Sequence, residues 1–290
     1  MVQSAVLIVL MIGASKEDAS TRLGEIYQKV VIPAKNELNI LVTPLPVHEK
    51  YYNEFFEDIN GAKFSYKLVE GAKPPKGFNV THILKSGHLL DCKPDYIIYC
   101  DGSGRIPFEN CIRLLNELKK RENLCILSER TPWRASIPPI RQCIEQFESY
   151  VVSKIFGSDE VYDLQCGLWG FLYPECSNFT ISCVGYELEL NVACEAFKKA
   201  GKVGLMIVQL NMSNASLSQF QGEDFSTQSA HYQKAYFLYK YFNLKKADLL
   251  EHATHYNSKV SQDRKLPEEY MYMLDEIDGE IKKPTITKLG

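Results

Sequence analysis

The chain has 290 residues, of which 45% are hydrophobic and 24% are charged, and its formal net charge is −3. This composition is typical of a globular protein and argues against intrinsic disorder. Charges of both signs are interspersed without a long basic run, so nucleic acid is not expected as a main partner.

The N-terminal run AVLIVLMIG (residues 5–13) is apolar but much shorter than a membrane-spanning helix. It also lacks the basic flank and the small-residue cleavage site of a signal peptide. We therefore expect a buried strand here, no integral membrane segment, and a cytoplasmic protein. The nine cysteines show no CxxC spacing and lie mostly in apolar segments, which favours buried free thiols over a disulfide framework.

Strand-like and helix-like segments alternate up to about residue 210, which predicts an α/β fold with a mainly parallel sheet covered by helices. The predicted strands cover residues 5–13, 38–47, 63–71, 96–100, 123–130, 168–174 and 202–210. The predicted helices run from a cap at Asp18 or Ser20 to about 36, and over 48–59, 77–90, 108–120, 138–157 and 185–201.

The chain changes character from about residue 225, where an aromatic helical segment begins. We expect an α/β domain of residues 1–224 and a helical C-terminal extension of residues 225–290. Tyr232, Tyr236 and Tyr239 recur at helical spacing. They predict either a simply packed helix or a surface that joins subunits into a homo-oligomer or covers the acceptor side of a site.

The stretch PDYIIYCDGSGRIPF (94–108) reads as a strand that stops at Asp101. Ligands of open α/β sheets bind outside the carboxyl ends of the strands, and the small residues Gly102 and Ser103 let a phosphate approach the backbone. Mg²⁺ or Mn²⁺ needs only one or two protein oxygens when a diphosphate and waters complete its shell. Asp101 is therefore a candidate metal ligand, with Ser103 as a weak or water-mediated oxygen; the alternative is an aspartate that caps a turn or helix.

Three later segments add polar side chains to the ends of predicted elements. In YDLQCGLWGF (162–171), Asp163 and Gln165 point to one face of an extended segment, and Gly167 gives the backbone room. The other candidates are two arginines suited to phosphate oxygens, two glutamates at a helix start that can equally serve the helix dipole, and three histidines that could complete a metal shell. They are Arg130, Arg134, Glu187, Glu189, His231, His252 and His255.

In their order and spacing, the Asp101 motif, LSER, YDLQCGLWGF and GYELEL resemble a group of family 2 glycosyltransferases. This group comprises the dolichyl-phosphate glucosyltransferases and mannosyltransferases, and the resemblance covers about residues 75–210. It implies the GT-A nucleotide-diphospho-sugar fold and transfer of a sugar, with inversion, from a nucleotide-sugar donor to an acceptor that the sequence does not identify.

Site roles also follow from the resemblance. It implies that Asp101, with Gly102 and Ser103 beside it, binds the diphosphate through Mn²⁺ or Mg²⁺. It implies that Arg130 faces the phosphate or acceptor side, and that Asp163 is the candidate base. It also implies that Gln165 lines the sugar or acceptor pocket and that either Glu187 or Glu189 supplies a carboxylate at the head of the following helix. Arg134 and Gly167 are added as substrate-binding residues from their own chemistry and position.

The chain departs from this family pattern on the nucleotide side. Ser103 replaces the second aspartate of the D-x-D motif, and Ala14-Ser15-Lys16-Glu17 stands where relatives usually carry Asn-Glu. Many relatives also have a membrane anchor, and its absence here weakens the case for a lipid acceptor. A non-catalytic GT-A-like module that binds a sugar, nucleotide or protein partner is therefore the alternative function.

Overall fold

The computed structural model describes the chain in segments that cover most of two compact units. The described residues are 5–10, 16–34, 38–43, 65–68, 77, 80, 81, 84, 94–131, 139–158, 160, 163–181, 183, 185–210 and 230–277. One unit, here called the sheet unit, consists of Met1–Pro132 and Asp163–Ala215, and the other, the helical unit, of Trp133–Tyr162 and Ser216–Gly290. This division differs from a single boundary at residue 224, because the helix predicted at 138–157 groups with the C-terminal helices.

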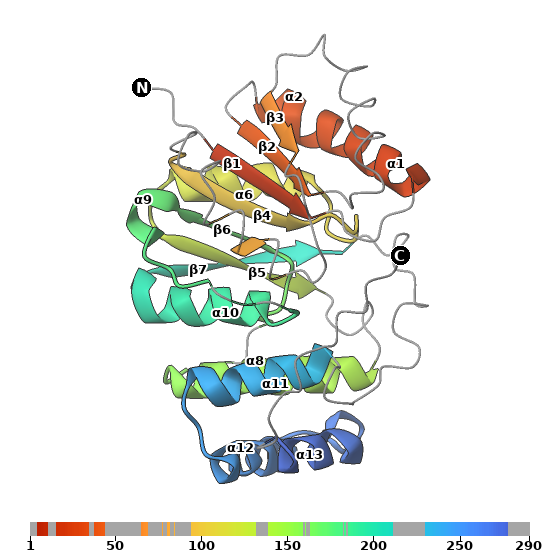
Figure 1. The fold of residues 1–290 in the computed structure, drawn as a ribbon, viewed down its shortest axis with the longest axis vertical. Coiled ribbons are helices and arrows are strands. Elements are labelled where there is room, and N and C mark those ends of the chain that lie inside the picture. Colours follow the sequence, from red (N-terminus) through yellow and green to blue (C-terminus); the bar gives the residue numbers. More distant parts are fainter. Residues whose placement is uncertain are drawn as a thin grey trace, which may run out of the picture. The chain divides into compact units, whose positions relative to one another are not determined.

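Seven strands in the described part of the chain form one sheet in the order β3-β2-β1-β4-β6-β5-β7 (Figure 1). Their bounds are β1 Ala5–Leu10, β2 Leu38–Thr43, β3 Ser65–Leu68, β4 Tyr96–Asp101, β5 Cys125–Thr131, β6 Leu168–Leu172 and β7 Val203–Gln209. Strand β6 is antiparallel to both neighbours, β4 and β5, and every other pair is parallel. The prediction of a mainly parallel sheet is confirmed.

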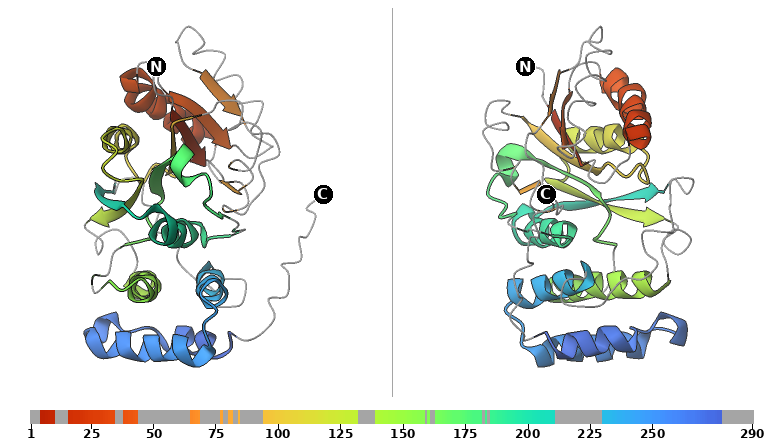
Figure 2. Two further views of the ribbon diagram at one scale, coloured as in Figure 1. Left: turned by 90° about the vertical axis from the view of Figure 1, so that its left-hand side faces the viewer. Right: turned by 45° about the vertical axis from the view of Figure 1, so that its right-hand side comes forward.

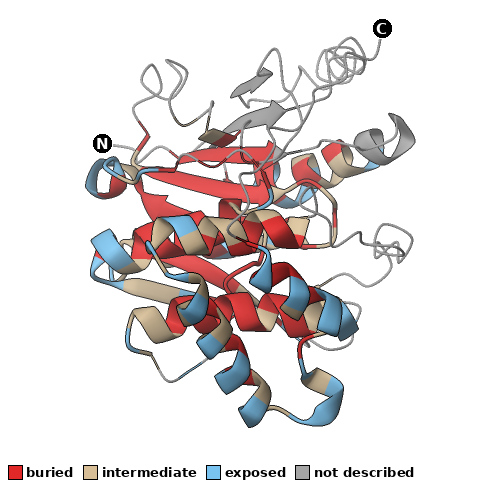
Figure 3. Ribbon diagram, turned by 60° about the horizontal axis from the view of Figure 1, so that its bottom comes forward, coloured by how far each residue is buried: buried red, intermediate tan, exposed pale blue. Residues whose placement is uncertain are grey.

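The central strands are buried on both faces, as a sheet covered by helices on both sides requires. All of Tyr96–Cys100 in β4 and all of Leu168–Leu172 in β6 are buried. Figure 3 shows strands of the sheet in the red of buried residues. In β1, Ala5–Val9 are buried as well, so the N-terminal apolar run forms the strand predicted for it.

Helices cover both faces of this sheet. Helices α1 (Lys16–Ile26), α2 (Ile32–Ala34) and α6 (Glu109–Lys119) contribute to a core with one set of alternating strand residues, including Tyr96, Ile98 and Cys100. Helix α10 (Leu188–Glu195) lies on the other side of the strands from α6 (Figure 2). A short helix, α9 (Tyr173–Cys176), follows β6.

Helix α6 approaches β6 closely because its apolar residues meet a glycine. Cys111, Leu114, Leu115 and Leu118 recur at helical spacing and are buried. A Cβ added at Gly170 would lie 2.6 Å from Leu114 Cδ2 and 2.8 Å from the Ile97 carbonyl oxygen. The glycine thus allows the helix to lie directly on the sheet beside the strand that carries Asp101.

The helical unit contains α8 (Pro139–Ile155), α11 (Ala230–Tyr241), α12 (Lys246–Lys259) and α13 (Glu268–Asp275). Its core includes Phe147 of α8, whose ring packs edge-on against Tyr256 and Tyr270. On α11, Tyr232 is buried, whereas Tyr236 and Tyr239 are half-buried. The homo-oligomer contact through this surface stays a prediction.

Other sequence predictions have mixed outcomes. The helix predicted at 48–59 lies outside the described residues. Of the nine cysteines, the eight that the structure describes are free and buried, which confirms the expectation for them. None of the helices in the described segments combines the length and apolar character needed to cross a bilayer.

Candidate functional site

Asp101 is the last residue of β4 and begins a tight turn at the carboxyl edge of the sheet. Its Oδ1 accepts a hydrogen bond of 2.9 Å from the Ser103 backbone N–H. Gly104 in the same turn has φ 74°, a left-handed conformation that glycine adopts without steric cost. The carboxylate therefore shapes the turn, as the alternative interpretation of Asp101 expected, and it does so at the position predicted for a ligand.

The segment before β6 is brought directly onto this turn. The Asp101 N–H donates a 2.7 Å hydrogen bond to the Gly167 carbonyl oxygen. A Cβ added at Gly167 would lie 2.8 Å from Asp101 Cβ and 3.5 Å from Asp101 Oδ2. Glycine at this position leaves the space beside the Asp101 carboxylate open.

Replacing Gly167 by alanine should therefore lower the free energy of unfolding by about 1–3 kcal/mol, the usual range for an overpacked site. Both contacting Cβ atoms are fixed to backbone, so neither side chain can rotate away. Gly24→Ala is the matched control, because a Cβ at Gly24 in α1 would meet nothing within 4 Å. That substitution should be neutral or stabilise by up to about 1 kcal/mol. Urea denaturation of both variants measures the difference, and equal stability would contradict the inferred contact.

Arg130 and Asp163, the predicted catalytic pair, meet as a buried ion pair. Arg130 Nε donates to Asp163 Oδ2, and Arg130 Nη2 donates to Oδ1 at 2.7 Å. The Arg130 side chain is 9% exposed and that of Asp163 is 2% exposed. Asp163 also accepts hydrogen bonds from the backbone N–H of Arg130 at 3.2 Å and of Gln165 at 3.1 Å. The two charges thus tie the end of β5 to the start of the 163–167 segment.

This geometry bears on the base role predicted for Asp163. Both of its carboxylate oxygens accept hydrogen bonds from Arg130, so a positioning role fits the contacts better than proton transfer. By strand alternation, Arg130 leaves β5 on the face of Ile126, which belongs to the core under α1 and α6. Asp101 alternates with Tyr99 and leaves β4 on the opposite face.

The two glutamates of GYELEL take different positions at the start of α10. Glu187 precedes the helix and accepts a local hydrogen bond of 3.1 Å from the Gly185 N–H. Glu189 lies in the first turn, is 6% exposed, and its charge acts on the Cys166 thiol. The charge of Glu189 thus contributes to the raised pKa of a thiol in the 163–167 segment.

The pKa of the Cys166 thiol responds to burial and to the charges at this edge of the sheet. Burial raises the pKa of its thiol well above the usual range, and the neighbouring Asp163 carboxylate raises it further, while Arg130 lowers it. Burial is also the main cause that raises the pKa of Cys183 to about 12. Both thiols therefore stay protonated at neutral pH and do not act as nucleophiles.

The other predicted ligands are Arg134 and three histidines. Arg134 lies outside the described residues. His231, His252 and His255 belong to the helical unit, where His231 lies beside Glu148 and the other two lie against Tyr150. Within the segments that the structure describes, no group of three or more His, Cys, Asp or Glu side chains is placed to hold a metal ion.

One residue at this edge has no signal in the sequence. Arg22, in α1, donates from Nη1 to the Gly102 carbonyl oxygen at 3.0 Å, so it holds the Asp101 turn from a helix 80 residues away in the chain. A lone arginine in an amphipathic helix is ordinary, and only the fold brings it to this turn.

No protein-family model matches the sequence, and no curated protein matches it either. Solved structures do match. Glucosyl-3-phosphoglycerate synthase from Mycobacterium tuberculosis has a TM-score of 0.56 at 11% identity, covering 84% of this chain and 81% of that one. Mannosyl-3-phosphoglycerate synthase from Rubrobacter xylanophilus has a TM-score of 0.53 at 14% identity, covering 84% and 76%. TarS residues 1–349 of S. aureus has a TM-score of 0.51 at 11% identity, covering 95% and 80%.

The fold is GT-A. This confirms the fold that the family resemblance implied. In this GT-A sheet the Asp101 turn, the Arg130–Asp163 pair and Gly167 all lie at the edge formed by the carboxyl ends of β4 and β5. This is the edge at which open α/β sheets bind their ligands.

Proposed function

We propose that the protein is a glycosyltransferase that moves a sugar from a nucleotide-diphosphate donor to an acceptor hydroxyl, with inversion at the anomeric carbon. The observation that carries this proposal is the contact between the Asp101 turn and the 163–167 segment at the carboxyl edge of a GT-A sheet. Glucosyl-3-phosphoglycerate synthase was crystallised with UDP, and TarS with UDP-GlcNAc, which supports a nucleotide-diphosphate donor.

The Asp101 turn fits a divalent cation that is shared with a donor diphosphate. The missing Cβ of Gly167 leaves room beside Asp101 Oδ2, and Ser103, whose backbone N–H binds Asp101 Oδ1, carries a hydroxyl in the same turn. A metal bridging to phosphates needs one or two protein oxygens, so a single carboxylate suffices. Bound Mn²⁺ or Mg²⁺ would neutralise charge on the departing diphosphate. The M. tuberculosis synthase was crystallised with Mn²⁺.

Some residues of the chain then position the substrates, and another accepts a proton. The Arg130–Asp163 pair positions the 163–167 segment, including Gln165, for the sugar or acceptor. A carboxylate must accept the proton of the acceptor hydroxyl as it attacks the anomeric carbon. Because Arg130 occupies both oxygens of Asp163, we assign this role to Glu189, with Asp163 as the alternative.

Asp101→Asn tests the donor site. Against a panel of nucleoside diphosphates and nucleotide sugars with Mn²⁺, the wild type should bind at least one, and the variant should bind it at least about tenfold more weakly, a loss of about 1.4 kcal/mol. The apo protein should lose no more than about 1 kcal/mol of stability, since the turn hydrogen bond can still form. Isothermal titration calorimetry and thermal denaturation measure the two quantities.

Asp95→Asn provides the matched control, because Asp95 lies just before the other end of the same strand. It should leave nucleotide affinity unchanged. Equal affinities for wild type, Asp101→Asn and Asp95→Asn would show that Asp101 is only a turn residue.

A non-catalytic binding module is the second candidate function. The pairing of Asp163 with Arg130 and the serine at position 103 both favour it, since each removes a carboxylate from chemistry. The two functions differ in turnover. A transferase releases the nucleoside diphosphate from its donor when it transfers the sugar to an acceptor or, more slowly, to water. Binding of a donor without any such release across an acceptor panel would favour the module.

A further inference from the structure

The Asp101 turn accepts a hydrogen bond from a cationic side chain, that of Arg22, which belongs neither to β4 nor to the turn itself. Arg22 Nη1 donates to the Gly102 carbonyl oxygen at 3.0 Å. Within the described segments, Arg22 makes no other hydrogen bond or ion pair. The nearby residues Leu23 and Ile26 of α1 are buried in the core. Their packing holds α1, and with it the backbone of Arg22, in place.

The remaining donors of this guanidinium stand beside the turn that we assign to the donor diphosphate. A guanidinium carries five N–H donors in a rigid plane, and one bond to Gly102 leaves most of them for an anion. That bond also orients the plane, so less rotational freedom is lost when phosphate oxygens bind. The side chain is half-buried, where a charge is screened less than in open solvent.

The local charge favours the same interpretation. A turn with two aspartates would carry two negative charges and would need a divalent cation before an anionic diphosphate could approach. Here position 103 is serine, so Asp101 is the one carboxylate of the turn, and Arg22 brings a positive charge to the backbone carbonyl of the next residue, Gly102. The turn therefore carries less negative charge than a turn with two aspartates would carry before a metal ion binds.

We propose that Arg22 is a phosphate-binding residue of the donor site and that it gives this site a metal-independent affinity for diphosphate groups. The proposal rests on the proposed function, because it assumes that the donor diphosphate lies at the Asp101 turn. It predicts that a divalent cation strengthens binding but is not required for it.

Titrations with inorganic pyrophosphate and with UDP, GDP, ADP and CDP, each in EDTA and in Mn²⁺, test this proposal on the full chain. The wild type should bind pyrophosphate and at least one nucleotide in EDTA. Arg22→Gln keeps an N–H donor for the Gly102 carbonyl but removes the charge, and it should weaken binding in EDTA by at least about tenfold. Arg22→Lys keeps the charge but loses the fork, and it should retain an intermediate affinity.

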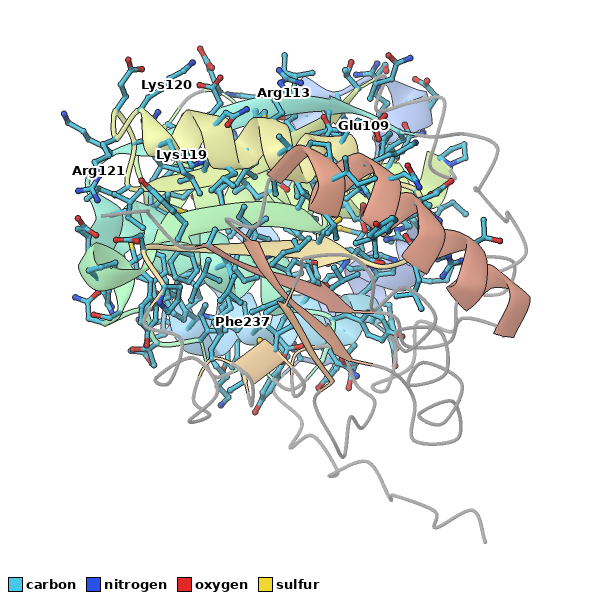
Figure 4. All side chains as sticks on the ribbon, turned by 90° about the horizontal axis from the view of Figure 1, so that it is seen from above. Glu109, Arg113, Lys119, Lys120, Arg121 and Phe237 are labelled. Atoms are coloured by element: carbon cyan, nitrogen blue, oxygen red, sulfur yellow. The ribbon has the colours of Figure 1, made fainter. Side chains whose placement is uncertain are left out.

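Arg113→Gln is the matched control. Arg113 lies on α6 (Figure 4) and likewise donates from Nη1 to a backbone carbonyl, that of Ile207 in β7, at 2.9 Å. This substitution should leave the affinities for pyrophosphate and for the nucleotide unchanged. Circular dichroism and melting temperature confirm that each variant is folded.

Different results overturn different parts. If Arg22→Gln binds in EDTA as tightly as the wild type, Arg22 only pins the turn and the inference is wrong. If the wild type binds a nucleotide in Mn²⁺ but nothing in EDTA, the inference is wrong and the proposed function stands. If the wild type binds neither pyrophosphate nor any nucleotide in either condition, the proposed function falls and takes the inference with it.

Discussion

Replacing Asp163 by alanine should lower the free energy of unfolding by about 3–5 kcal/mol, the range for breaking a buried ion pair from one side. The loss arises because Arg130, whose side chain is 9% exposed, keeps its charge without the carboxylate that accepts its hydrogen bonds. Two backbone N–H groups, of Arg130 and Gln165, also lose their acceptor. Chemical denaturation in urea measures the loss, and a change under about 1 kcal/mol would show that the pair is not buried in solution.

Two comparisons separate this effect from a general sensitivity to charge removal. Glu117→Ala breaks the exposed ion pair with Lys120, whose side chain is 53% exposed, and it should cost no more than about 1 kcal/mol. The double variant Arg130→Met with Asp163→Leu removes both charges together and should recover much of the loss. If the double variant is as unstable as Asp163→Ala, the loss of stability comes from the two backbone N–H groups that lose their acceptor, and not from the unpaired charge of Arg130.

The same pair shows how the structure changes a role expected from the sequence. An aspartate two residues before a glutamine, in a segment that resembles a substrate-lining motif, is a reasonable candidate base. The residue that removes this freedom, Arg130, lies 33 positions earlier and was predicted to face the phosphate or acceptor side. Segment patterns predict that both residues lie at one edge of the sheet, but they carry no information on whether the two side chains bind each other.

The fold itself was accessible from the sequence because local patterns and topology agree. Continuous apolar runs such as Tyr96–Cys100 predict buried strands, and the 3.6-residue spacing of Cys111, Leu114 and Leu118 predicts a covering helix. The antiparallel direction of β6 was not predicted, because its apolar run has the same pattern in either direction. The grouping of α8 with the C-terminal helices was missed for a related reason: an apolar stripe predicts that a helix packs, but not which partner it packs against.

Gly167 and Arg22 show what sequence patterns can and cannot predict about this site. Gly167 was singled out because a glycine after a polar segment often permits close approach, and it does contact Asp101. Arg22 was not singled out, because its partner, the Gly102 carbonyl, is a backbone atom 80 residues away. A side chain that recognises backbone leaves no trace in the sequence of its partner.

The helical unit contains a second buried charge cluster, which centres on α8 and α11. Lys234 Nζ lies 3.1 Å from Glu145 Oε1 and 3.9 Å from Glu148 Oε2. Both glutamates are fully buried, and Lys234 is 6% exposed. Arg141 Nε donates to Glu145 at 2.8 Å, and the Tyr270 hydroxyl donates to Glu148 at 3.2 Å. Since the two glutamates are three residues apart on one helix, their charges repel each other unless cations lie between or beside them.

Lys234→Met should therefore lower the free energy of unfolding by about 3–5 kcal/mol, although methionine preserves most of the apolar stem. The lysine is the cation that both carboxylates share, so its removal takes an ammonium group away from Glu145 and Glu148 together, while Arg141 still pairs with Glu145. Lys246→Met is the matched control: its ammonium pairs with Asp275, the two side chains are 33% and 55% exposed, and the expected cost is under about 1 kcal/mol. Adding Glu148→Gln to Lys234→Met removes one buried charge and should restore part of the loss in urea denaturation. If Lys234→Met proves as stable as Lys246→Met, water must reach the two glutamates in solution, and the cluster cannot be what fixes α11 against α8.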